Sequence, residues 1–512
     1  METLLKTTLY ASLLLATSHN IARAEQIDAG AIETRTTSLS QAVSKISPRH
    51  SQIALLAMDM SSNQVIFSQQ AETLFIPAST QKLLTAVSAM AQLGPDFRYV
   101  TELWTDAPIR KGHIAGSAYL RFSGDPTLTQ ADLKAIFASL VKQGINRIDG
   151  HLYLLGDKQE QMQAPGWVWD DLGICFAAPV SSYIINQNCV YGQFNPSTAN
   201  KPSQVSLRTG SYGVKVSSDA VFDPKASREF CQLDLVRLGQ NNYHLRGCYP
   251  GGEAIGLAIA VSDPFKFAQD NLTSLLKGEM SLAGKVKLGT SLPKKAKLIA
   301  SHSSAPLPEL LDTMLLKSDN LIADSLFKQL GKSYFNAQGS FTNGAAAMQR
   351  ILTELGVDLS NANIVDGSGL SRYNLLNAQQ LAAVLALIHK DSRFSPLITS
   401  LPQAGISGTL RYRMGYNKPP LKQQIFAKTG SMQGVSNLAG FIRLPEHSDT
   451  LFVVLENGMS PELKHQHKPS FNAEFLKQLI SVLQVPSPTT AALSTAAHSV
   501  QDLILPNRNS MI

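Results

Sequence analysis

The sequence lacks the features that would place it across a membrane or on nucleic acid. Charged residues make up only 16% of its 512 residues, and no run of five Lys or Arg occurs. No uninterrupted apolar run of about 18 residues follows the N-terminal segment, which excludes a protein with several membrane spans. Zinc-finger and RNP-like spacings are also absent. The formal net charge of +7 is small for this length, and we expect no nucleic-acid partner.

Several site signatures are missing as well. A Gly-x-Ser-x-Gly elbow is absent, which disfavours an α/β-hydrolase, and so is a glycine-rich phosphate-binding fingerprint. Neither CxxC nor HxxxH spacing occurs, which disfavours zinc. His465 and His467 lie between Lys464 and Lys468, and we interpret them as part of an exposed basic loop. We therefore expect no metal and no cofactor.

The first 24 residues are typical of a signal peptide. Lys6 supplies a weak positive region, residues 13–16 form the centre of an apolar segment, and Ala22-Arg23-Ala24 fits a small-x-small cleavage site. We predict that cleavage before Glu25 leaves no transmembrane anchor. The alternative is an N-terminal membrane helix that is never removed.

The chain has four cysteines. An even number on an exported protein favours disulfides, and four cysteines allow three pairings. We predict the local pairs Cys175–Cys189 and Cys231–Cys248, because each pair lies in its own segment. All four lie between residues 175 and 248, which indicates a region that is stabilised separately from the rest.

Hydrophobic periodicity predicts strands at 53–60 and 64–68, then a helix over 80–93 that Gly94-Pro95 ends. Residues 97–300 have a β-rich, irregular pattern, with strand-like runs at 99–104 and 214–216. The following elements are expected after residue 300: a helix from Pro306 through Leu315, a helix over 321–330 closed by Gly331, a helix over 377–389 that starts at an Asn377/Gln380 capping box, strands at 437–444 and 450–456, and a helix over 470–483.

Three short motifs carry candidate chemistry: Ser79-Thr80-Gln81-Lys82, Ser318-Asp319-Asn320 and Lys428-Thr429-Gly430. Other Ser-x-x-Lys sequences start at residues 139, 274, 291 and 325, but only the first stands at the start of a predicted helix. There Ser79 and Lys82 share one face. A serine needs an adjacent base to be nucleophilic, and Lys82 can be that base only if burial and a second cation make it neutral.

The other two motifs complete a catalytic set. The Ser318 hydroxyl can relay a proton to a leaving amine, and the Asn320 amide can orient Lys82 or a substrate amide. The third motif follows a strand-like run at 424–427, where an edge strand can pair with an extended peptide.

Around this edge strand, Lys428 and Thr429 can bind a terminal carboxylate. Gly430 permits close approach of a substrate backbone. The backbone amides of Ser79 and Ser431 are candidates for an oxyanion hole. Lys428 is also the candidate second cation beside Lys82.

The order and context of the three motifs resemble the penicillin-recognising serine enzymes. The chain is most similar to the low-molecular-weight class C penicillin-binding proteins, the D-alanyl-D-alanine carboxypeptidase/endopeptidase family. Further matching segments lie at 122–128, 164–167, 366–372 and 437–441. The long separation of Ser79 from Ser318 indicates that the chain carries the inserted domains of that family, which a compact β-lactamase lacks.

The resemblance implies an α/β fold: a β-lactamase/transpeptidase-like domain, in which helices flank an antiparallel sheet, with two smaller β-rich inserted domains. The expected division is a signal peptide over 1–24, a split catalytic domain over 25–96 and 301–485, inserted domain II over 97–194 and 254–300, inserted domain III over 195–253, and a disordered tail over 486–512.

The resemblance also implies a reaction. Ser79 would attack a D-Ala-D-Ala peptide bond of a peptidoglycan stem peptide, and water would release the acyl-enzyme. β-Lactams would act as inhibitors, and cross-links between D-Ala and diaminopimelate would be further substrates. Asp171, Phe176, Arg372 and Gln433 are the candidate stem-peptide pocket. With the signal peptide, the family implies a periplasmic location; a β-lactamase and a non-catalytic wall-binding protein are the alternatives.

Overall fold

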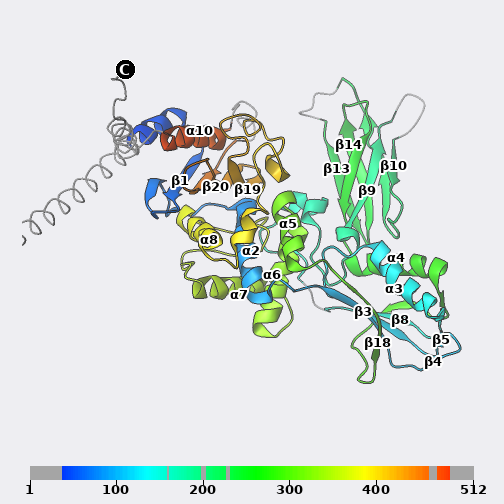
Figure 1. The fold of residues 1–512 in the computed structure, drawn as a ribbon. Coiled ribbons are helices and arrows are strands. Elements are labelled where there is room, and N and C mark those ends of the chain that lie inside the picture. The colour runs from blue at the N-terminus through cyan, green and yellow to red at the C-terminus, as the bar shows by residue number, and fades with distance from the viewer. Residues whose placement is uncertain (1–36, 158–160, 198–202, 226–230, 461–469, 485–512) are drawn as a thin grey trace, which may run out of the picture.

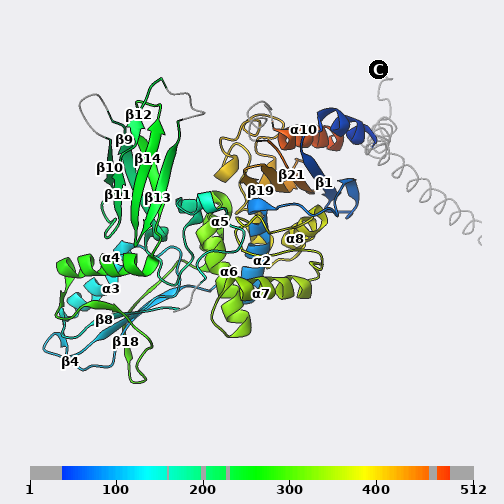
Figure 2. The same cartoon turned by 180° about the vertical axis from the view of Figure 1, so that it is seen from behind.

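The computed structural model describes residues 37–157, 161–197, 203–225, 231–460 and 470–484. Figures 1 and 2 show a helix-rich part that contains both ends of the described chain, a lower part in which two helices lie on β-sheet, and an upright part made of strands. The predicted signal peptide, the predicted tail and the pair His465 and His467 lie outside the described residues.

A five-stranded antiparallel sheet forms the centre of the helix-rich part, in the order β19-β20-β21-β1-β2. Its strands are β1 (Gln52–Asp59), β2 (Val65–Gln69), β19 (Ile425–Met432), β20 (Val435–Ile442) and β21 (Thr450–Asn457). β1 pairs with β21 along its whole length, from Gln52 opposite Asn457 to Asp59 opposite Thr450. The sheet therefore joins segments that are almost 400 positions apart in the sequence.

Helices cover both faces of this sheet, which explains why β20 is buried at every residue. On one face the helix over 37–46 and α10 (Phe471–Leu483) share a hydrophobic cluster with Phe452 and Val454 of β21. The other face packs against a second cluster of helices: α2 (Lys82–Leu93), α5 (Leu307–Lys317), α6 (Asn320–Phe335), α7 (Phe341–Glu354) and α8 (Ala378–Lys390). Figure 1 shows this arrangement, with α10 above the sheet and α2 and α8 below it.

The start of α8 confirms the predicted capping box. The Gln380 backbone N–H donates to Asn377 Oδ1 over 2.8 Å, and the Asn377 backbone N–H donates to Gln380 Oε1 over 3.0 Å. The end predicted for the helix over 321–330 is wrong. This helix, α6, continues past Gly331 to Phe335 and ends at Asn336, which has a positive φ of 47°. Gly331 is required instead for the packing of α7: a Cβ there would meet Asn343 Oδ1 at 2.1 Å and the Gly344 nitrogen at 2.6 Å.

The lower part contains two helices that the sequence pattern did not predict, α3 (Gln130–Lys142) and α4 (Pro264–Glu279). Their start signals are present, because Thr129 and Asp132 form a capping box and Asp263 caps α4 in front of a proline. These helices cover a sheet of order β17-β8-β6-β3-β18, next to a smaller sheet of order β16-β7-β5-β4.

The strands of the lower part are β3 (Val100–Thr105), β4 (Ile109–Arg110), β5 (His113–Ile114), β6 (Ala118–Arg121), β7 (Arg147–Ile148), β8 (Leu152–Leu155), β16 (Ser281–Leu282), β17 (Val286–Leu288) and β18 (Lys297–Ser303). The upright part is built from β9 (Cys189–Asn195), β10 (Gln204–Leu207), β11 (Lys215–Ser218), β12 (Val221–Phe222), β13 (Leu233–Gly239), β14 (Asn242–Tyr249) and β15 (Ile255–Ala260). Short 3₁₀ helices are η1 (Ala78–Gln81), η2 (Trp169–Asp171), η3 (Cys175–Ala177), η4 (Asn186–Asn188), η5 (Ser395–Ile398) and η6 (Gly408–Leu410).

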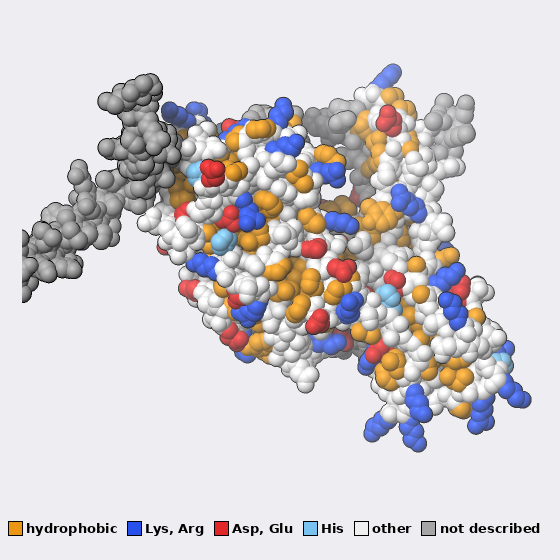
Figure 3. Space-filling view, viewed as in Figure 1, with side chains coloured by type: hydrophobic (Ala, Val, Ile, Leu, Met, Phe, Trp, Pro, Cys, Tyr) orange, Lys and Arg blue, Asp and Glu red, His pale blue; other side chains and the backbone are white. Residues whose placement is uncertain are grey.

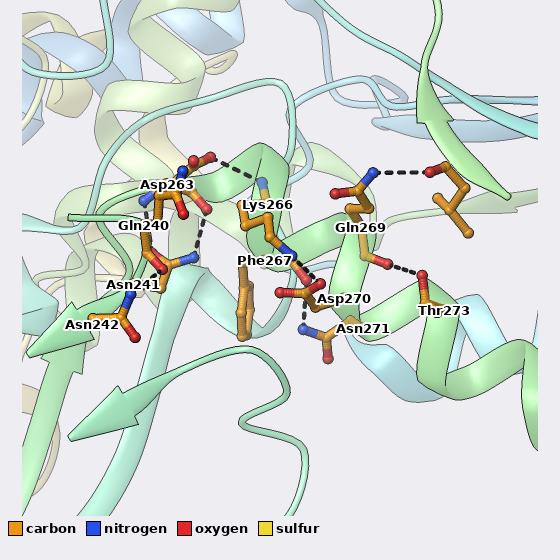
Figure 4. Close-up of polar contacts among 11 residues, drawn as sticks. Gln240, Asn241, Asn242, Asp263, Lys266, Phe267, Gln269, Asp270, Asn271 and Thr273 are labelled. Carbon is orange, nitrogen blue, oxygen red and sulfur yellow. Dashed lines mark hydrogen bonds and ion pairs between the residues drawn. The ribbon is translucent and has the colours of Figure 1, made fainter. Parts of the chain in front are cut away.

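Polar contacts attach the upright part to α4. Asn241, at the turn between β13 and β14, is fully buried, and its amide donates to the Asp263 carbonyl over 2.9 Å and accepts from the Asp263 N–H over 2.8 Å. Figure 4 shows these contacts beside the Lys266–Asp270 ion pair on the first turns of α4. These contacts fix the β13–β14 hairpin to the N-terminal end of α4.

Both predicted disulfides are present, Cys175–Cys189 and Cys231–Cys248. The mixed α/β fold, with helices on both faces of an antiparallel sheet, is as predicted. The domain boundaries stay a proposal. The helix-rich and lower parts have separate hydrophobic clusters, but Trp167 and Val180 pack in the first, and Tyr243 and Ile259 of the upright part pack in the second. No helix among the described residues is long and apolar enough to span a bilayer.

The close contact between α6 and α7 can be tested at Gly331, with Gly278 of α4 as the control. We expect Gly331→Ala to destabilise the protein by about 1–3 kcal/mol, because the added methyl group meets backbone of α7 that cannot move aside. Gly278→Ala, in the last turn of α4 with no atom near the new Cβ, should stabilise by up to about 1 kcal/mol. Urea unfolding of both variants measures the difference, and equal effects would contradict this account.

Candidate active site

Ser79 lies in η1, the 3₁₀ turn that leads directly into α2. The α-helix itself begins at Lys82 rather than at Thr80, so the predicted start is two residues early. The backbone at Ala78 has a positive φ of 47°, and Gly369 packs so closely on Ala78 that a Cβ there would lie 1.9 Å from the Ala78 carbonyl oxygen. Ser79 is therefore held between the helix and the segment around Gly369.

Lys82 is fully buried and donates to three oxygens. Its Nζ lies 2.9 Å from Ser79 Oγ, 2.7 Å from Asn320 Oδ1 and 2.7 Å from the Ser368 carbonyl oxygen. The Asn320 side chain in turn donates to the Phe176 carbonyl over 2.9 Å. The first two motifs thus meet at the Lys82 amine, as expected, whereas none of the three motifs indicates the contact with the Ser368 carbonyl.

Burial lowers the pKa of Lys82 to about 8, because the charged ammonium loses its hydration. The negative charges of Asp324, Asp366 and Asp319 act in the opposite direction and limit the fall. Burial raises the pKa of Asp324 itself well above its usual range, and the nearby Asp366 carboxylate adds to this rise. A substantial fraction of Lys82 is therefore neutral near pH 8, which suits a general base.

Lys428 is a second fully buried lysine. Its Nζ donates to Ser318 Oγ over 2.8 Å and to the Thr429 carbonyl over 3.0 Å. Ser318 follows the end of α5 with a positive φ of 59°, so that its hydroxyl stands at the junction of α5 and α6 as predicted. Burial, followed by the charges of Lys82 and Arg413, holds the pKa of Lys428 well below its usual value.

The third motif lies inside β19 rather than after it, because the strand extends to Met432. β19 is the edge strand of the sheet. The Ala427 N–H points away from β20 and donates to the Pro402 carbonyl over 2.9 Å. Since the direction of backbone groups repeats every second residue, the N–H and C=O of Thr429 and Ser431 also point to this open edge.

Gly430 has a different role from the one expected. A Cβ at this position would lie 2.7 Å from the Pro77 carbonyl oxygen and 3.2 Å from Thr80 Cγ2. The missing side chain therefore lets β19 pack against η1, and the close approach is between two parts of the protein. Thr429 points its hydroxyl to the Thr409 hydroxyl, 2.8 Å away.

One cavity brings together the remaining predicted residues. Its lining includes Ser79, Ser318, Asn320 and Ser431 together with all four candidate stem-peptide residues, Asp171, Phe176, Arg372 and Gln433. Val168, Asp170, Gly369, Leu370 and Met432 complete the lining. Lys82, Lys428 and Thr429 are buried behind this surface.

Charges of both signs line the cavity, at Asp171 and Arg372. Arg372 donates to the Gln433 carbonyl over 3.2 Å. Partial burial raises the pKa of Asp171, while the positive charge of Arg372 acts against the rise. An acid and a base in one cavity can bind a zwitterionic group. The described residues contain no group of three His, Cys, Asp or Glu side chains that could hold a metal ion.

A buried carboxylate supports the segment that carries Ser368. Asp366 is fully buried and accepts hydrogen bonds at its two oxygens from the Gly369 N–H at 2.8 Å, the Ser371 N–H at 2.7 Å, Asn374 Nδ2 at 2.8 Å and Trp167 Nε1 at 2.9 Å. Asp324 accepts from the Gly367 and Ser368 N–H groups. Asp366 belongs to the matching segment 366–372, and that segment was the available signal for it.

Comparisons with known proteins agree with this geometry. A family model described as D-Ala-D-Ala carboxypeptidase 3 (S13) matches residues 36–478. The D-alanyl-D-alanine carboxypeptidase DacB of Haemophilus influenzae is 35% identical over 447 residues, which are 85% of this chain and 92% of that protein. A D-alanyl-D-alanine carboxypeptidase of Actinomadura sp. is 28% identical over 79% of this chain and 78% of its own length.

Solved structures give the same result. The crystal structure of penicillin binding protein 4 from Haemophilus influenzae superposes with a TM-score of 0.81 and 33% identity, covering 86% of this chain and 98% of that one. The structure of the same protein complexed with a β-lactam superposes with a TM-score of 0.77 and 32% identity, with the same coverage.

The Asp366 network can be tested by its contribution to folding. We expect Asp366→Ala to lower the free energy of unfolding by more than about 3 kcal/mol, because it leaves several buried donors without an acceptor. Asp358→Ala is the matched control: its exposed carboxylate also accepts a backbone N–H, that of Ser360, and its loss should cost less than about 1 kcal/mol. Urea unfolding measures both, and a small loss for Asp366→Ala would disprove the supporting role.

Proposed function

Because the chain belongs to the D-Ala-D-Ala carboxypeptidase 3 (S13) family and is a serine-type D,D-peptidase, we propose that Ser79 is its nucleophile and Lys82 the general base. The observation that carries this assignment is the 2.9 Å contact between Nζ of the fully buried Lys82 and Oγ of Ser79, which lines the cavity. The lowered pKa of Lys82 makes the neutral amine available. A non-catalytic wall-binding protein would not need a buried lysine amine in contact with this serine.

The first step forms the acyl-enzyme. Neutral Lys82 takes the proton of Ser79 as Oγ attacks the carbonyl carbon of the bond between the two D-Ala residues. The oxygen of that carbonyl gains negative charge, and the backbone N–H groups of Ser79 and Ser431 are the proposed donors to it. Ser431 suits this role because its N–H points to the open edge of β19.

The second motif completes the step. The Ser318 hydroxyl, which accepts from Lys428 Nζ over 2.8 Å, passes its proton to the nitrogen of the departing D-Ala and takes a proton in return from the Lys428 ammonium. The terminal carboxylate of the substrate lies near Lys428 and Thr429 in our proposal. Its negative charge favours the protonated form of Lys428, so that substrate binding opposes the fall in the Lys428 pKa that burial causes. Water then hydrolyses the ester on Ser79.

We further propose the substrate class. Asp171 and Arg372 line the cavity with Phe176 and Gln433, and the charge of Arg372 acts on Asp171. This pair matches the ammonium and carboxylate at the end of a diaminopimelate side chain. Such recognition extends the activity from D-Ala-D-Ala termini to D-Ala–diaminopimelate cross-links of peptidoglycan. We propose a periplasmic site of action, which the predicted signal peptide and this substrate support.

A β-lactamase is the second candidate, and the lifetime of a β-lactam adduct separates the two. We propose that β-lactams acylate Ser79 and remain bound, as inhibitors do, because they hold the leaving group in place. A β-lactamase would release the opened drug quickly. The β-lactam complex of the Haemophilus influenzae protein supports β-lactam binding at this site.

The nucleophile is tested by substitution. Ser79→Ala should lower D-Ala release from a pentapeptide ending in D-Ala-D-Ala by about a thousandfold or more and abolish the penicillin adduct seen by mass spectrometry. Ser139→Ala is the control, because Ser139 and Lys142 form the same Ser-x-x-Lys pattern on α3 and should leave both readouts unchanged. Unaltered D-Ala release by folded Ser79→Ala protein would refute the proposal.

The pH profile tests the base. With a Lys82 pKa of about 8, kcat/KM for the small peptide should rise by about tenfold per pH unit below pH 8 and level off above it, because only the neutral amine accepts the proton. Circular dichroism over the same range controls for unfolding. A rate that is independent of pH between 6 and 9, or that falls as pH rises, would exclude Lys82 as the base.

A further inference from the structure

A tryptophan at the rim of the catalytic cavity has no role in the mechanism above. Trp169 stands in η2 between Val168 and Asp170, which both line the cavity, yet 76% of its surface is exposed. Indole rings supply large, rigid contact surfaces at low cost in conformational entropy. A ring exposed beside a binding cavity is therefore in position to contact the part of a substrate that extends out of it.

The upright part places a cation over this ring. The guanidinium carbon of Arg237, on β13, lies 5.1 Å from the centre of the Trp169 ring. Within the part of the chain that the structure describes, Arg237 forms no salt bridge with a carboxylate. Figures 1 and 2 both show β13 on the side of the upright part that faces the helix-rich part. In Figure 3 a hollow separates these two parts, and hydrophobic and basic side chains border it.

The segment at the rim of the cavity, residues 168–176 (the rim segment), is fixed to the upright part, so that Trp169 and Arg237 keep their relative positions. The Ala260 N–H of β15 donates to the Gly173 carbonyl over 3.1 Å, and Ile174 forms a bridge with Ile259. The Cys175–Cys189 disulfide adds a covalent link between the rim and β9. The strands of the upright part thus hold one side of the cavity rim, and β13 places Arg237 over the Trp169 ring there.

We propose that Trp169 and Arg237 form an outer subsite for the glycan-proximal end of the stem peptide. The Trp169 ring stacks against a sugar ring, and Arg237 binds a carboxylate of the peptide that the sugar carries. This inference rests on the proposed function, in which the D-Ala end of the same peptide lies at Ser79. A sugar presents C–H groups suited to an aromatic face, and the stem peptide presents the anion that Arg237 lacks.

The experiment compares two substrates with the same D-Ala-D-Ala terminus. One is an acetylated tripeptide without sugar, and the other is a disaccharide-pentapeptide. We expect Trp169→Ala to lower kcat/KM for the sugar-bearing substrate by about tenfold and to change the tripeptide rate by less than about twofold. Trp169→Phe keeps an aromatic face and should retain most of the activity on the sugar-bearing substrate.

Arg237→Gln provides the second arm. This variant should have a severalfold lower kcat/KM for the disaccharide-pentapeptide. The difference should disappear when the glutamate carboxyl group of that peptide is amidated, because the anion is then absent. Tyr191→Ala is the matched control: Tyr191 lies on β9, is 43% exposed and has Arg208 over its ring at 5.6 Å. It should leave both substrates unaffected.

The outcomes separate this inference from the function on which it rests. If the wild-type protein does not cleave the tripeptide, the proposed function fails. If it does, but Trp169→Ala lowers kcat/KM equally for both substrates or for neither, the outer subsite is refuted. Titration of the disaccharide-pentapeptide into Ser79→Ala protein, with and without Trp169→Ala, checks binding without turnover and should show about a tenfold weaker Kd.

Discussion

Two lysine ammonium groups buried side by side are the constraint around which the site is organised. Lys82 and Lys428 are both fully buried, and burying two like charges is costly unless hydrogen bonds and opposite charges compensate. Lys82 is surrounded by oxygens of Ser79, Asn320 and Ser368 and lies within the fields of buried carboxylates. The three motifs are therefore mutually dependent, since each supplies a partner that keeps these amines in place and partly neutral.

Short motifs and helix signals made much of this site predictable. The Ser79/Lys82 spacing, the Asn377 capping box and the two cysteine pairs are local patterns, and the structure contains each as predicted. Longer-range features were missed because no local pattern encodes them. Lys82 meets the Ser368 carbonyl only after folding, and Gly331 and Gly430 are dictated by neighbouring backbone. The α3 and α4 helices were hidden by the irregular composition around them.

The strands of the upright part hold the segment that lines one side of the cavity with Val168, Asp170, Asp171 and Phe176. The rim segment around Gly173 is bound to β15 and, through the Cys175–Cys189 disulfide, to β9. Asn320 also donates to the Phe176 carbonyl in this segment. The upright part is thus connected through a few bonds to the amide that accepts from Lys82 Nζ, so its packing and the geometry around Lys82 are coupled.

The pairing of β1 with β21 has a consequence for the timing of maturation. The central sheet needs Gln52–Asp59 and Thr450–Asn457 together, and β19, which carries Lys428, joins only through β20. During synthesis, which proceeds from the N-terminus at about 5–20 residues per second, Ser79 therefore emerges long before the strands that complete its surroundings. The complete set of contacts around Ser79 therefore forms only after nearly the entire chain has been made.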